Sequence, residues 1–284
     1  MSLANGFNRT QREAWPPLRR CFANVLASLN MLARPPRAGT PRFAAMSPQT
    51  LAAGVIIAIV TFLLLAWAID AAAIRGTAKL PRWIISAFDD ITDFGKSGWF
   101  LWPLGVLFLA LAALPSAPTA ISQRVLAAIM VRVGFLFAAI ALPSLFVTVV
   151  KRIIGRARPM VGGSLDPFLF VPMKWHAAYA GMPSGHATTA FAVLVAFGTL
   201  WPRGRTVLLI YAALIALSRV VVTAHYPSDV LAGALVGAVG AMMVRRYFAL
   251  RGLGFSTGPG AQIRQFPGPS IRRVKAVARG LLAS

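Results

Sequence analysis

The stretch Leu51–Ile69 reads LAAGVIIAIVTFLLLAWAI and contains no charged side chain. A helix needs about 20 predominantly apolar residues to cross the hydrocarbon core of a bilayer. The whole chain of 284 residues is 57% hydrophobic and only 13% charged, whereas soluble domains carry about 25% charged residues. This stretch therefore predicts a transmembrane helix, and the composition predicts others.

Five further apolar stretches follow the first one along the chain. Several are close to the lower length limit for a membrane span, so we expect tilted helices or a thin local bilayer. Most tryptophans lie near the predicted span ends. This position is typical of the membrane interface, which accommodates both an apolar ring and a polar N–H group. We predict an all-α polytopic membrane protein with six transmembrane helices, at residues 48–69, 99–115, 125–150, 186–201, 206–222 and 229–244.

The distribution of charge argues against a nucleic-acid-binding protein. The formal net charge is +22, and such a basic balance alone would fit a polyanionic partner. The cations lie, however, in the two tails and in loops between apolar spans, as in bacterial membrane proteins. We therefore predict a bilayer as the surroundings and no nucleic-acid partner, and the sequence leaves the oligomeric state open.

The basic residues also predict an orientation in the bacterial inner membrane. One side holds the N-terminal tail, two loops and the C-terminal part after the last span, from residue 245 onward. These carry seven, one, two and eight Lys and Arg residues, with Glu13 as their one acid. The opposite side holds the other six acids and all three histidines. Because basic loops stay in the cytoplasm, we predict cytoplasmic termini. Arg132 falls inside the third span and is expected to snorkel toward the cytoplasmic face.

Two basic tails flank a predicted membrane domain of residues 48–247. Residues 1–47 are rich in Arg and Pro, which predicts a disordered arm, and Met46 is an alternative start of translation to Met1. In residues 248–284, apolar side chains recur at helical spacing between Ile271 and Leu282, with cations among them. This stretch fits either a helix on anionic lipid or an unstructured tail.

Three polar clusters adjoin the predicted spans. They are Lys151-Arg-Ile-Ile-Gly-Arg-Ala-Arg158-Pro159, then Pro183-Ser184-Gly185-His186, then Ser218-Arg219 with His225 and Asp229 after it. Charged and polar side chains are costly in a membrane and mark functional sites by default. The order of the spans brings all three clusters to the extracytoplasmic face. Because the spans are predicted from hydropathy alone, this shared location is independent support for a common site.

The residue types in the three clusters fit phosphoryl transfer. Lys151, Arg158 and Arg219 supply three cations, and guanidinium groups match phosphate oxygens in pairs. Pro183 is suited to the start of a helix, where the N–H groups near Ser184 and Gly185 would face an anion. Such a cradle would stabilise a charged transition state.

Two histidines can then share the chemistry. Asp229 follows His225 by four positions and can accept its Nδ1–H, which leaves Nε2 free to attack phosphorus. His186 would donate the proton to the leaving oxygen. Each cluster alone has a simpler explanation: an interfacial cation, a helix start or a hydrogen-bonded loop histidine. Their order and complementary roles on one face favour the catalytic interpretation.

The full pattern, Lys with Arg-Pro seven positions later, then Pro-Ser-Gly-His, then Ser-Arg with His and Asp, resembles the signature of the type 2 phosphatidic acid phosphatase superfamily. The resemblance covers about residues 48–247 and implies an acid-phosphatase and vanadium-haloperoxidase-like helical bundle. It implies a metal-independent lipid phosphatase without a cofactor, and the sequence contains no carboxylate cluster for a metal. It assigns His225 as nucleophile, His186 as acid, Asp229 as the partner of His225, and Lys151, Arg158, Ser184, Gly185 and Arg219 as phosphate ligands.

The sequence leaves the substrate open among undecaprenyl pyrophosphate, lipid A phosphate, phosphatidylglycerophosphate and phosphatidic acid. A phosphotransferase would use the same phosphohistidine with a lipid acceptor in place of water. A haloperoxidase would hold vanadate in the same cradle, although six lipid-embedded spans argue against it. A non-catalytic binding or transport protein is disfavoured because the polar groups gather at one face. The polar segment Asp89–Trp99 fits either head-group recognition or a solvated turn.

Overall fold

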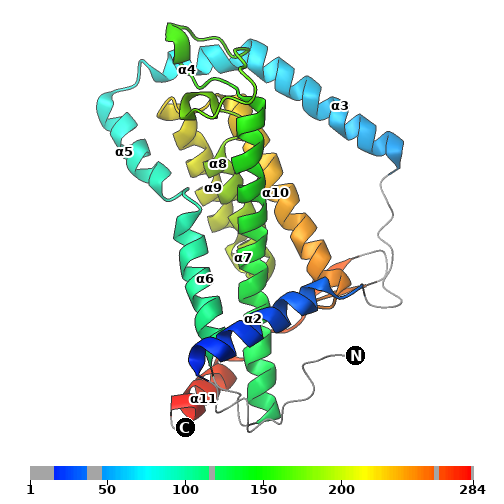
Figure 1. Ribbon diagram of the computed structural model, residues 1–284. Helices are drawn as coiled ribbons and strands as arrows, with labels where there is room; N and C mark the ends of the chain where they lie inside the picture. Colours follow the sequence, from blue (N-terminus) through cyan, green and yellow to red (C-terminus); the bar gives the residue numbers. More distant parts are fainter. Residues whose placement is uncertain (1–15, 37–46, 115–118, 259–261, 283–284) are drawn as a thin grey trace. The chain divides into compact units, whose positions relative to one another are not determined.

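Helices make up almost all of the regular structure in the computed structural model, which describes residues 16–36, 47–114, 119–258 and 262–282 (Figure 1). The longer elements are α2 (Pro17–Ala33), α3 (Pro48–Leu65), α4 (Ala71–Thr77), α5 (Arg82–Asp93), α6 (Gly98–Ala113), α7 (Ala120–Ile154), α8 (Gly185–Leu200), α9 (Arg205–Val221), α10 (Pro227–Leu250) and α11 (Ile271–Leu282). A π-helical turn, η2 (Ala66–Asp70), joins α3 to α4, and three 3-10 turns are η3 (Val161–Gly163), η4 (Ala177–Tyr179) and η5 (Pro202–Gly204). The prediction of an all-α membrane protein is confirmed.

Within these residues, five helical segments are long and apolar enough to cross a membrane. They are Pro48–Thr77, Arg82–Ala113, Ala120–Ile154, Pro202–Val221 and Pro227–Leu250. The fourth predicted span corresponds to α8, which is apolar but has only 16 residues. The count of six spans therefore stays a prediction.

Local sequence explains where several of these helices begin. Ser47 caps α3 by accepting a hydrogen bond from the Thr50 N–H group at 3.1 Å, with Pro48 in the first turn. Pro227 opens α10, and its missing N–H group costs nothing at a helix start. Ser184 is the N-terminal capping residue of α8, although its side chain makes no capping hydrogen bond.

The chain divides into two compact units. The first unit comprises Met1–Pro41, Trp102–Phe137 and Arg245–Ser284, and the second comprises Arg42–Leu101 and Ala138–Val244. The helices α6, α7 and α10 each contribute residues to both units. The two units are described separately below.

In the second unit, α8 and α9 pack side by side (Figure 1) through a buried cluster of Ala190, Ala212 and Ile215. Glycines bring α10 against α8. A Cβ atom at Gly233 would collide with the Ser184 carbonyl oxygen, and one at Gly237 would collide with that of Thr188. Small residues let helix backbones approach closely inside a membrane, where packing and not the hydrophobic effect holds helices together.

The first unit contains the N-terminal helix α2 and a short antiparallel hairpin, β1 (Phe255–Thr257) paired with β2 (Ile263–Gln265). Its core includes Phe135, whose ring centroid lies 5.5 Å from that of Phe248 and 4.9 Å from that of Phe255. Edge-to-face contacts of this kind stabilise buried aromatic clusters. The sequence reasoning did not predict the hairpin.

The prediction of a disordered arm over residues 1–47 is wrong for Pro17–Ala33, which forms α2. The prolines and many of the arginines of residues 1–47 lie on either side of the amphipathic run Leu18–Ala33, which contains no proline. The composition of the whole range therefore did not indicate a helix. The Asn24 side chain also donates to the Ala112 carbonyl oxygen at 2.7 Å. Residues 1–15 and 37–46 lie outside the described residues. Of the two forms left open for residues 271–282, the structure has the helix.

Candidate active site

The structure brings the three polar clusters together within the second unit. The Ser184 N–H group donates to the Asp229 carbonyl oxygen at 3.0 Å, which joins the second cluster to the third. The His225 N–H group donates to the Arg219 carbonyl oxygen at 3.1 Å. The Arg156 side chain, in the first cluster, donates to Ser228 Oγ at 2.7 Å and to Asp229 Oδ1, which joins the first cluster to the third.

Four buried polar atoms of these clusters have no hydrogen-bond partner among the described residues: Arg158 Nε, Ser184 Oγ, Arg219 Nε and His225 Nδ1. Buried polar atoms are nearly always hydrogen-bonded, so unsatisfied ones call for an explanation. All four belong to residues that the sequence assigned to phosphate binding or catalysis. Unpartnered donors on Arg158, Ser184 and Arg219 are what an anion-binding site would require, whereas His225 Nδ1 lies on the side of Asp229.

The N-terminus of α8 adds backbone donors to this site. A Cβ atom at Gly185 would meet no other atom within 4 Å, so packing within the chain does not require glycine there. The first N–H groups of a helix have no partner within the helix and favour an anion. The Thr188 hydroxyl group donates to the Ser184 carbonyl oxygen at 2.9 Å and fixes this turn.

A neighbouring helix orients the Arg219 guanidinium group. The Arg219 Nη1 atom donates to the hydroxyl oxygen of Thr92, on α5, at 2.6 Å. In the first cluster, the Arg158 N–H group donates to the Ala178 carbonyl oxygen at 2.8 Å. Burial lowers the pKa of Arg158, an effect that the Asp229 carboxylate opposes. The Thr92 hydroxyl group thus holds the Arg219 guanidinium group, whereas the bond to Ala178 fixes the Arg158 backbone.

The predicted hydrogen bond between His225 and Asp229 is absent from this conformation. His225 Nδ1 lies 3.7 Å from Asp229 Oδ2, which is too far for a hydrogen bond. That carboxylate oxygen instead accepts from the Tyr226 N–H group at 3.0 Å. Burial lowers the pKa of His225 below its ordinary value, and Asp229 opposes this shift. The neutral imidazole, which is the nucleophilic form, therefore prevails near neutral pH.

Arg156 is the largest omission of the sequence reasoning. Its side chain is completely buried, and its Nη1 atom donates to Asp229 Oδ1 and, at 2.7 Å, to Ser228 Oγ. Its Nη2 atom donates to Asp70 Oδ2 at 2.8 Å. The guanidinium carbon also lies 4.9 Å from the centroid of the Tyr226 ring.

Asp70 completes this buried network from the end of the first span. Its Oδ1 atom accepts from the Ser228 N–H group at 3.0 Å. One signal for this was present in the sequence, because a carboxylate that directly follows an apolar span is costly unless it is paired. We name Asp70, Arg156, Ser228 and Asp229 the Arg156 network.

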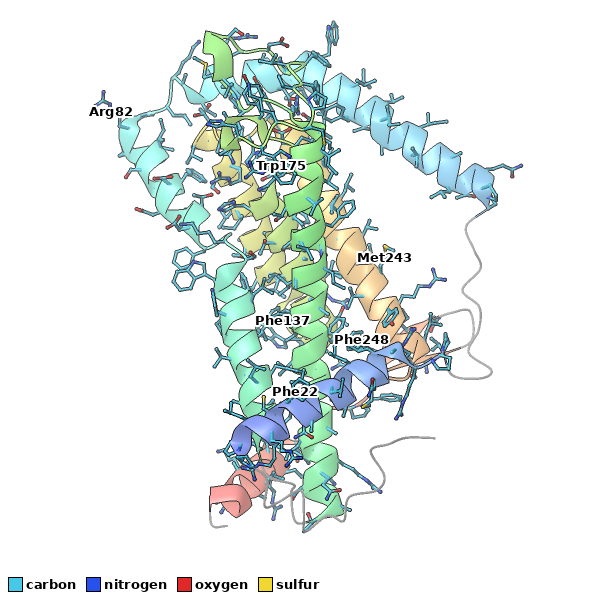
Figure 2. All side chains as sticks on the ribbon, in the orientation of Figure 1. Phe22, Arg82, Phe137, Trp175, Met243 and Phe248 are labelled. Atoms are coloured by element: carbon cyan, nitrogen blue, oxygen red, sulfur yellow. The ribbon has the colours of Figure 1, made fainter. Side chains whose placement is uncertain are left out.

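The segment Asp89–Trp99 borders the candidate site. Besides the Thr92 contact, an ideal Cβ atom at Gly95 would lie 2.9 Å from His186 Cδ2, so Gly95 lets the chain pass directly beside the imidazole. Lys96 pairs with Asp93 at 2.7 Å, and both side chains are more than half exposed. The exposed His176 accepts a hydrogen bond from the Ala178 N–H group at 3.3 Å within its own loop. Figure 2 shows the neighbouring Trp175, whose side chain is 69% exposed.

Within the described residues, no group of three or more His, Cys, Asp or Glu side chains lies close enough to hold a metal ion. The candidate site is thus defined by cations, backbone donors and two histidines. That combination has the groups that binding and transfer of a phosphate group require.

The comparisons with known proteins agree with this class of site. A sequence profile of the PAP2 superfamily matches residues 132–252, a range that contains all eight predicted site residues. The chain belongs to this superfamily, the type 2 phosphatidic acid phosphatases, and the family and its relatives support a membrane lipid phosphatase. A lipid A 1-phosphatase of Rhizobium johnstonii is 35% identical over 185 residues, which cover 65% of this chain and 76% of the relative.

A lipid A 1-phosphatase of Rhizobium etli is 34% identical over 185 residues, which cover 65% of this chain and 80% of the relative. Among solved structures, Aquifex aeolicus LpxE is 21% identical with a TM-score of 0.46 over 63% of this chain and 95% of that chain. A phosphatidylglycerolphosphate phosphatase from Bacillus subtilis is 20% identical with a TM-score of 0.43 over 67% of this chain and 93% of that chain. The bacterial relatives and the apolar helices support an inner-membrane protein.

Proposed function

We propose that this protein hydrolyses the 1-phosphate of lipid A at the extracytoplasmic face of the membrane. The observation that carries the phosphatase assignment is the set of buried donors without a partner on Arg158, Ser184 and Arg219, three residues of the polar clusters. The choice of lipid A among the four candidate substrates rests on the names of the two curated relatives.

In the proposed reaction, the cations and backbone donors hold the phosphate group. Arg158 and Arg219 direct their unpartnered Nε–H groups to its oxygens, together with Ser184 Oγ and the N–H groups of the first turn of α8. Lys151 adds a further positive charge that interacts with Arg158. Fixed donors of this kind stabilise the charge that builds up on the transferring group.

His225 then attacks phosphorus through Nε2, and the bond from phosphorus to the lipid oxygen breaks. His186 gives its proton to that oxygen, which leaves as a hydroxyl group. In the second step, a water molecule gives a proton to His186 and attacks the phosphohistidine, which releases inorganic phosphate and restores both imidazoles. A phosphate dianion beside His186 favours the protonated imidazole that the first step needs.

Asp229 supports His225 through charge in this scheme. With the carboxylate 3.7 Å from Nδ1, a small movement on substrate binding would make the hydrogen bond, since catalytic hydrogen bonds often tighten only in the complex. The Arg156 network holds Asp229 in position while leaving one oxygen directed toward the imidazole. We propose no metal in either step.

The orientation is proposed from the basic residues of the tails and loops, with both termini in the cytoplasm. Reporter fusions at residues 40, 204 and 260 should then report a cytoplasmic location, and one at residue 170 an extracytoplasmic location. A cytoplasmic signal at residue 170 would contradict the proposed site of hydrolysis.

The test of function is release of inorganic phosphate by the detergent-purified protein. Lipid A, undecaprenyl pyrophosphate, phosphatidylglycerophosphate and phosphatidic acid are supplied at equal mole fraction in mixed micelles. Preferred hydrolysis of lipid A, with loss of its 1-phosphate alone, supports the proposal. Phosphate that appears on an added lipid acceptor and not in solution would identify a phosphotransferase instead.

A further inference from the structure

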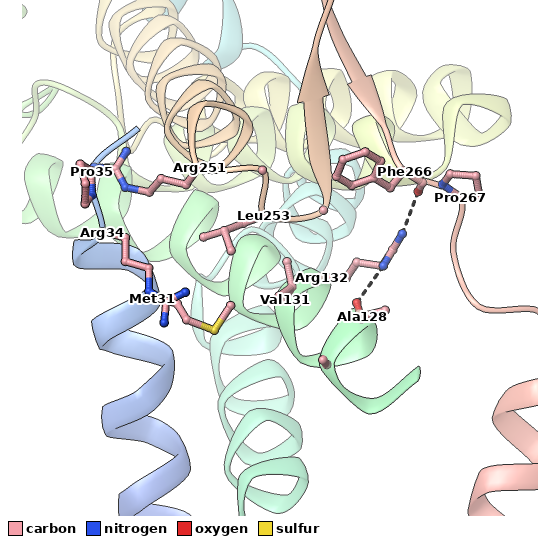
Figure 3. A pocket seen from close by; sticks show the side chains of 13 residues that line it. Met31, Arg34, Pro35, Ala128, Val131, Arg132, Arg251, Leu253, Phe266 and Pro267 are labelled. Atoms are coloured by element: carbon pink, nitrogen blue, oxygen red, sulfur yellow. Dashed lines mark hydrogen bonds between the residues drawn. The ribbon is translucent and has the colours of Figure 1, made fainter. Parts of the chain in front are cut away.

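A cavity lined by no residue of the candidate active site lies within the first unit (Figure 3). Its volume is about 430 Å³. The walls come from the C-terminal end of α2, from residues 127–132 of α7, and from residues 251–254 and 266–267 after α10. Segments far apart in the sequence thus converge on one hollow.

Three arginines line this cavity: Arg34, Arg132 and Arg251. Arg132 donates to the carbonyl oxygens of Ala128 and Phe266, each at 2.8 Å (Figure 3). The Arg251 Nε atom donates to the Leu32 carbonyl oxygen at 2.8 Å. Both guanidinium groups are therefore fixed by neutral oxygens, which orient the charge without neutralising it.

The rest of the first unit supplies no opposite charge in its described part. Glu13 is the one acid in the unit's sequence ranges and lies outside the described residues, whereas Lys and Arg recur throughout. A guanidinium group has five N–H donors in a planar fork that matches phosphate and carboxylate oxygens. An anion from outside the chain would supply the counter-charge that the described residues of this unit lack.

Apolar side chains share the cavity with the arginines. Met31, Val131, Leu253 and Phe266 line it as well. On α2, which supplies Met31, apolar side chains are exposed along one face: Leu18 is 85% and Phe22 72% exposed, the latter labelled in Figure 2. A helix with such a face and flanking arginines lies in the membrane interface. The cavity thus combines anion donors with an apolar wall, and it adjoins a helix whose apolar side chains are exposed.

We propose that this cavity binds the phosphate head group of an anionic phospholipid. Arg34 and Arg251 would contact the phosphate, and the acyl chains would follow Met31 and Leu253 toward the bilayer. Basic pockets between membrane helices bind anionic head groups by this combination of contacts. The proposal does not depend on the phosphatase reaction, because no residue of the candidate active site lines the cavity.

The test measures lipid retention by the full-length protein. Protein purified in a neutral detergent is mixed with phosphatidylglycerol or phosphatidylcholine at equal mole fraction, and bound lipid is counted by native mass spectrometry. The wild-type protein should retain one phosphatidylglycerol with saturable binding and lose phosphatidylcholine. Arg34→Gln should weaken retention about fivefold, the contribution of roughly one arginine near anionic lipid.

Arg272→Gln is the matched control, since it removes the same charge from an exposed position on α11 outside the cavity. It should retain phosphatidylglycerol as the wild type does. Equal losses for Arg34→Gln and Arg272→Gln would show diffuse attraction and overturn the proposed site. Equal retention of the two lipids, or displacement of phosphatidylglycerol by millimolar inorganic phosphate, would overturn the assignment of a lipid ligand. Turnover is not the readout, so failure here leaves the phosphatase proposal intact.

Discussion

The Arg156 guanidinium group donates a hydrogen bond of 2.8 Å to the carboxylate of Asp70, which lies 86 positions earlier in the chain, and both side chains are completely buried. The same guanidinium group donates to Asp229, the proposed partner of His225. One cation thus pairs with two carboxylates and links the end of the first span to the first turn of α10, next to His225. Arg156 is accordingly a positioning residue in the proposed mechanism.

Arg156→Gln should lower the free energy of unfolding by about 3–5 kcal/mol, since it leaves two buried carboxylates without their cation. Unfolding by sodium dodecyl sulfate in mixed micelles measures the change. Arg156→Lys retains the charge without the planar fork, so it should recover part of the stability and still lower kcat with little change in KM. Arg152→Gln, outside the network, should leave both quantities unchanged. A stable and fully active Arg156→Gln protein would refute the positioning role.

The histidines should differ in their response to the leaving group. His225→Ala should abolish the acid-labile phosphoenzyme with every substrate, because the nucleophile is gone. His186→Ala should lose roughly 10²–10⁴-fold in rate on a lipid alkoxide and much less on para-nitrophenyl phosphate, whose phenolate leaves without a proton. Rates on both substrates and acid-quench trapping of labelled protein measure the contrast. His176→Ala, in the exposed loop, is the control and should behave as wild type.

The pH dependence of kcat/KM should report His225. Burial lowers its pKa, so the neutral nucleophile persists below the ordinary value of about 6.5, and the rate falls only when the pH passes below the lowered pKa. Asp229 raises that pKa, so Asp229→Asn should shift the acid limb to still lower pH while reducing the maximal rate. The exposed Asp90→Asn is the control. A shift of the acid limb to higher pH in Asp229→Asn would contradict the assignment.

Gly185→Ala should weaken substrate binding without changing the stability of the fold. Since the added methyl group meets no protein atom within 4 Å, the unfolding transition should not change. The methyl group should enter the space proposed for the phosphate and raise KM roughly tenfold, the equivalent of one charge-assisted hydrogen bond. Gly54→Ala, also free of neighbours within 4 Å, should change neither quantity. Gly237→Ala should instead destabilise the fold, because its methyl group collides with the Thr188 backbone.

Metal chelation should leave the rate unchanged, because the proposed steps use only side chains and backbone donors. Orthovanadate should inhibit by occupying the phosphate cradle as a mimic of the transferring group. Phosphate release is measured with and without EDTA, and again after addition of magnesium, to determine whether the rate depends on a metal ion. A rate that vanishes with EDTA and returns with magnesium would disprove the metal-free mechanism.

The sequence predicted the parts of the site whose residues carry a local signal. Pro183, Ser184 and Gly185 predict a helix start, and in the structure α8 begins at Gly185 with Ser184 as its capping residue. The Arg156 network was missed because the sequence showed at most that Asp70 needs a partner, and residues 156 and 229 lie too far along the chain for a local pattern to identify them. The predicted contact between His225 and Asp229 followed from their spacing, but spacing could not reveal that Arg156 and the Tyr226 N–H group also bind that carboxylate. Average composition likewise concealed α2 between proline-rich flanks.

The contacts of Gly233 and Gly237 with the α8 backbone have a consequence for the choice of solvent. Because the α8 and α10 backbones are in van der Waals contact, steric packing sets the distance between the two helices. That distance does not depend on the strength of the hydrophobic effect. The Ser184 and Asp229 backbones meet at one end of this contact, near His186 and His225, the two histidines of the candidate site. The geometry of the site should therefore be the same in thick bilayers, thin bilayers and short-chain detergents. The activity measured in the purification micelle should then represent the activity in the membrane.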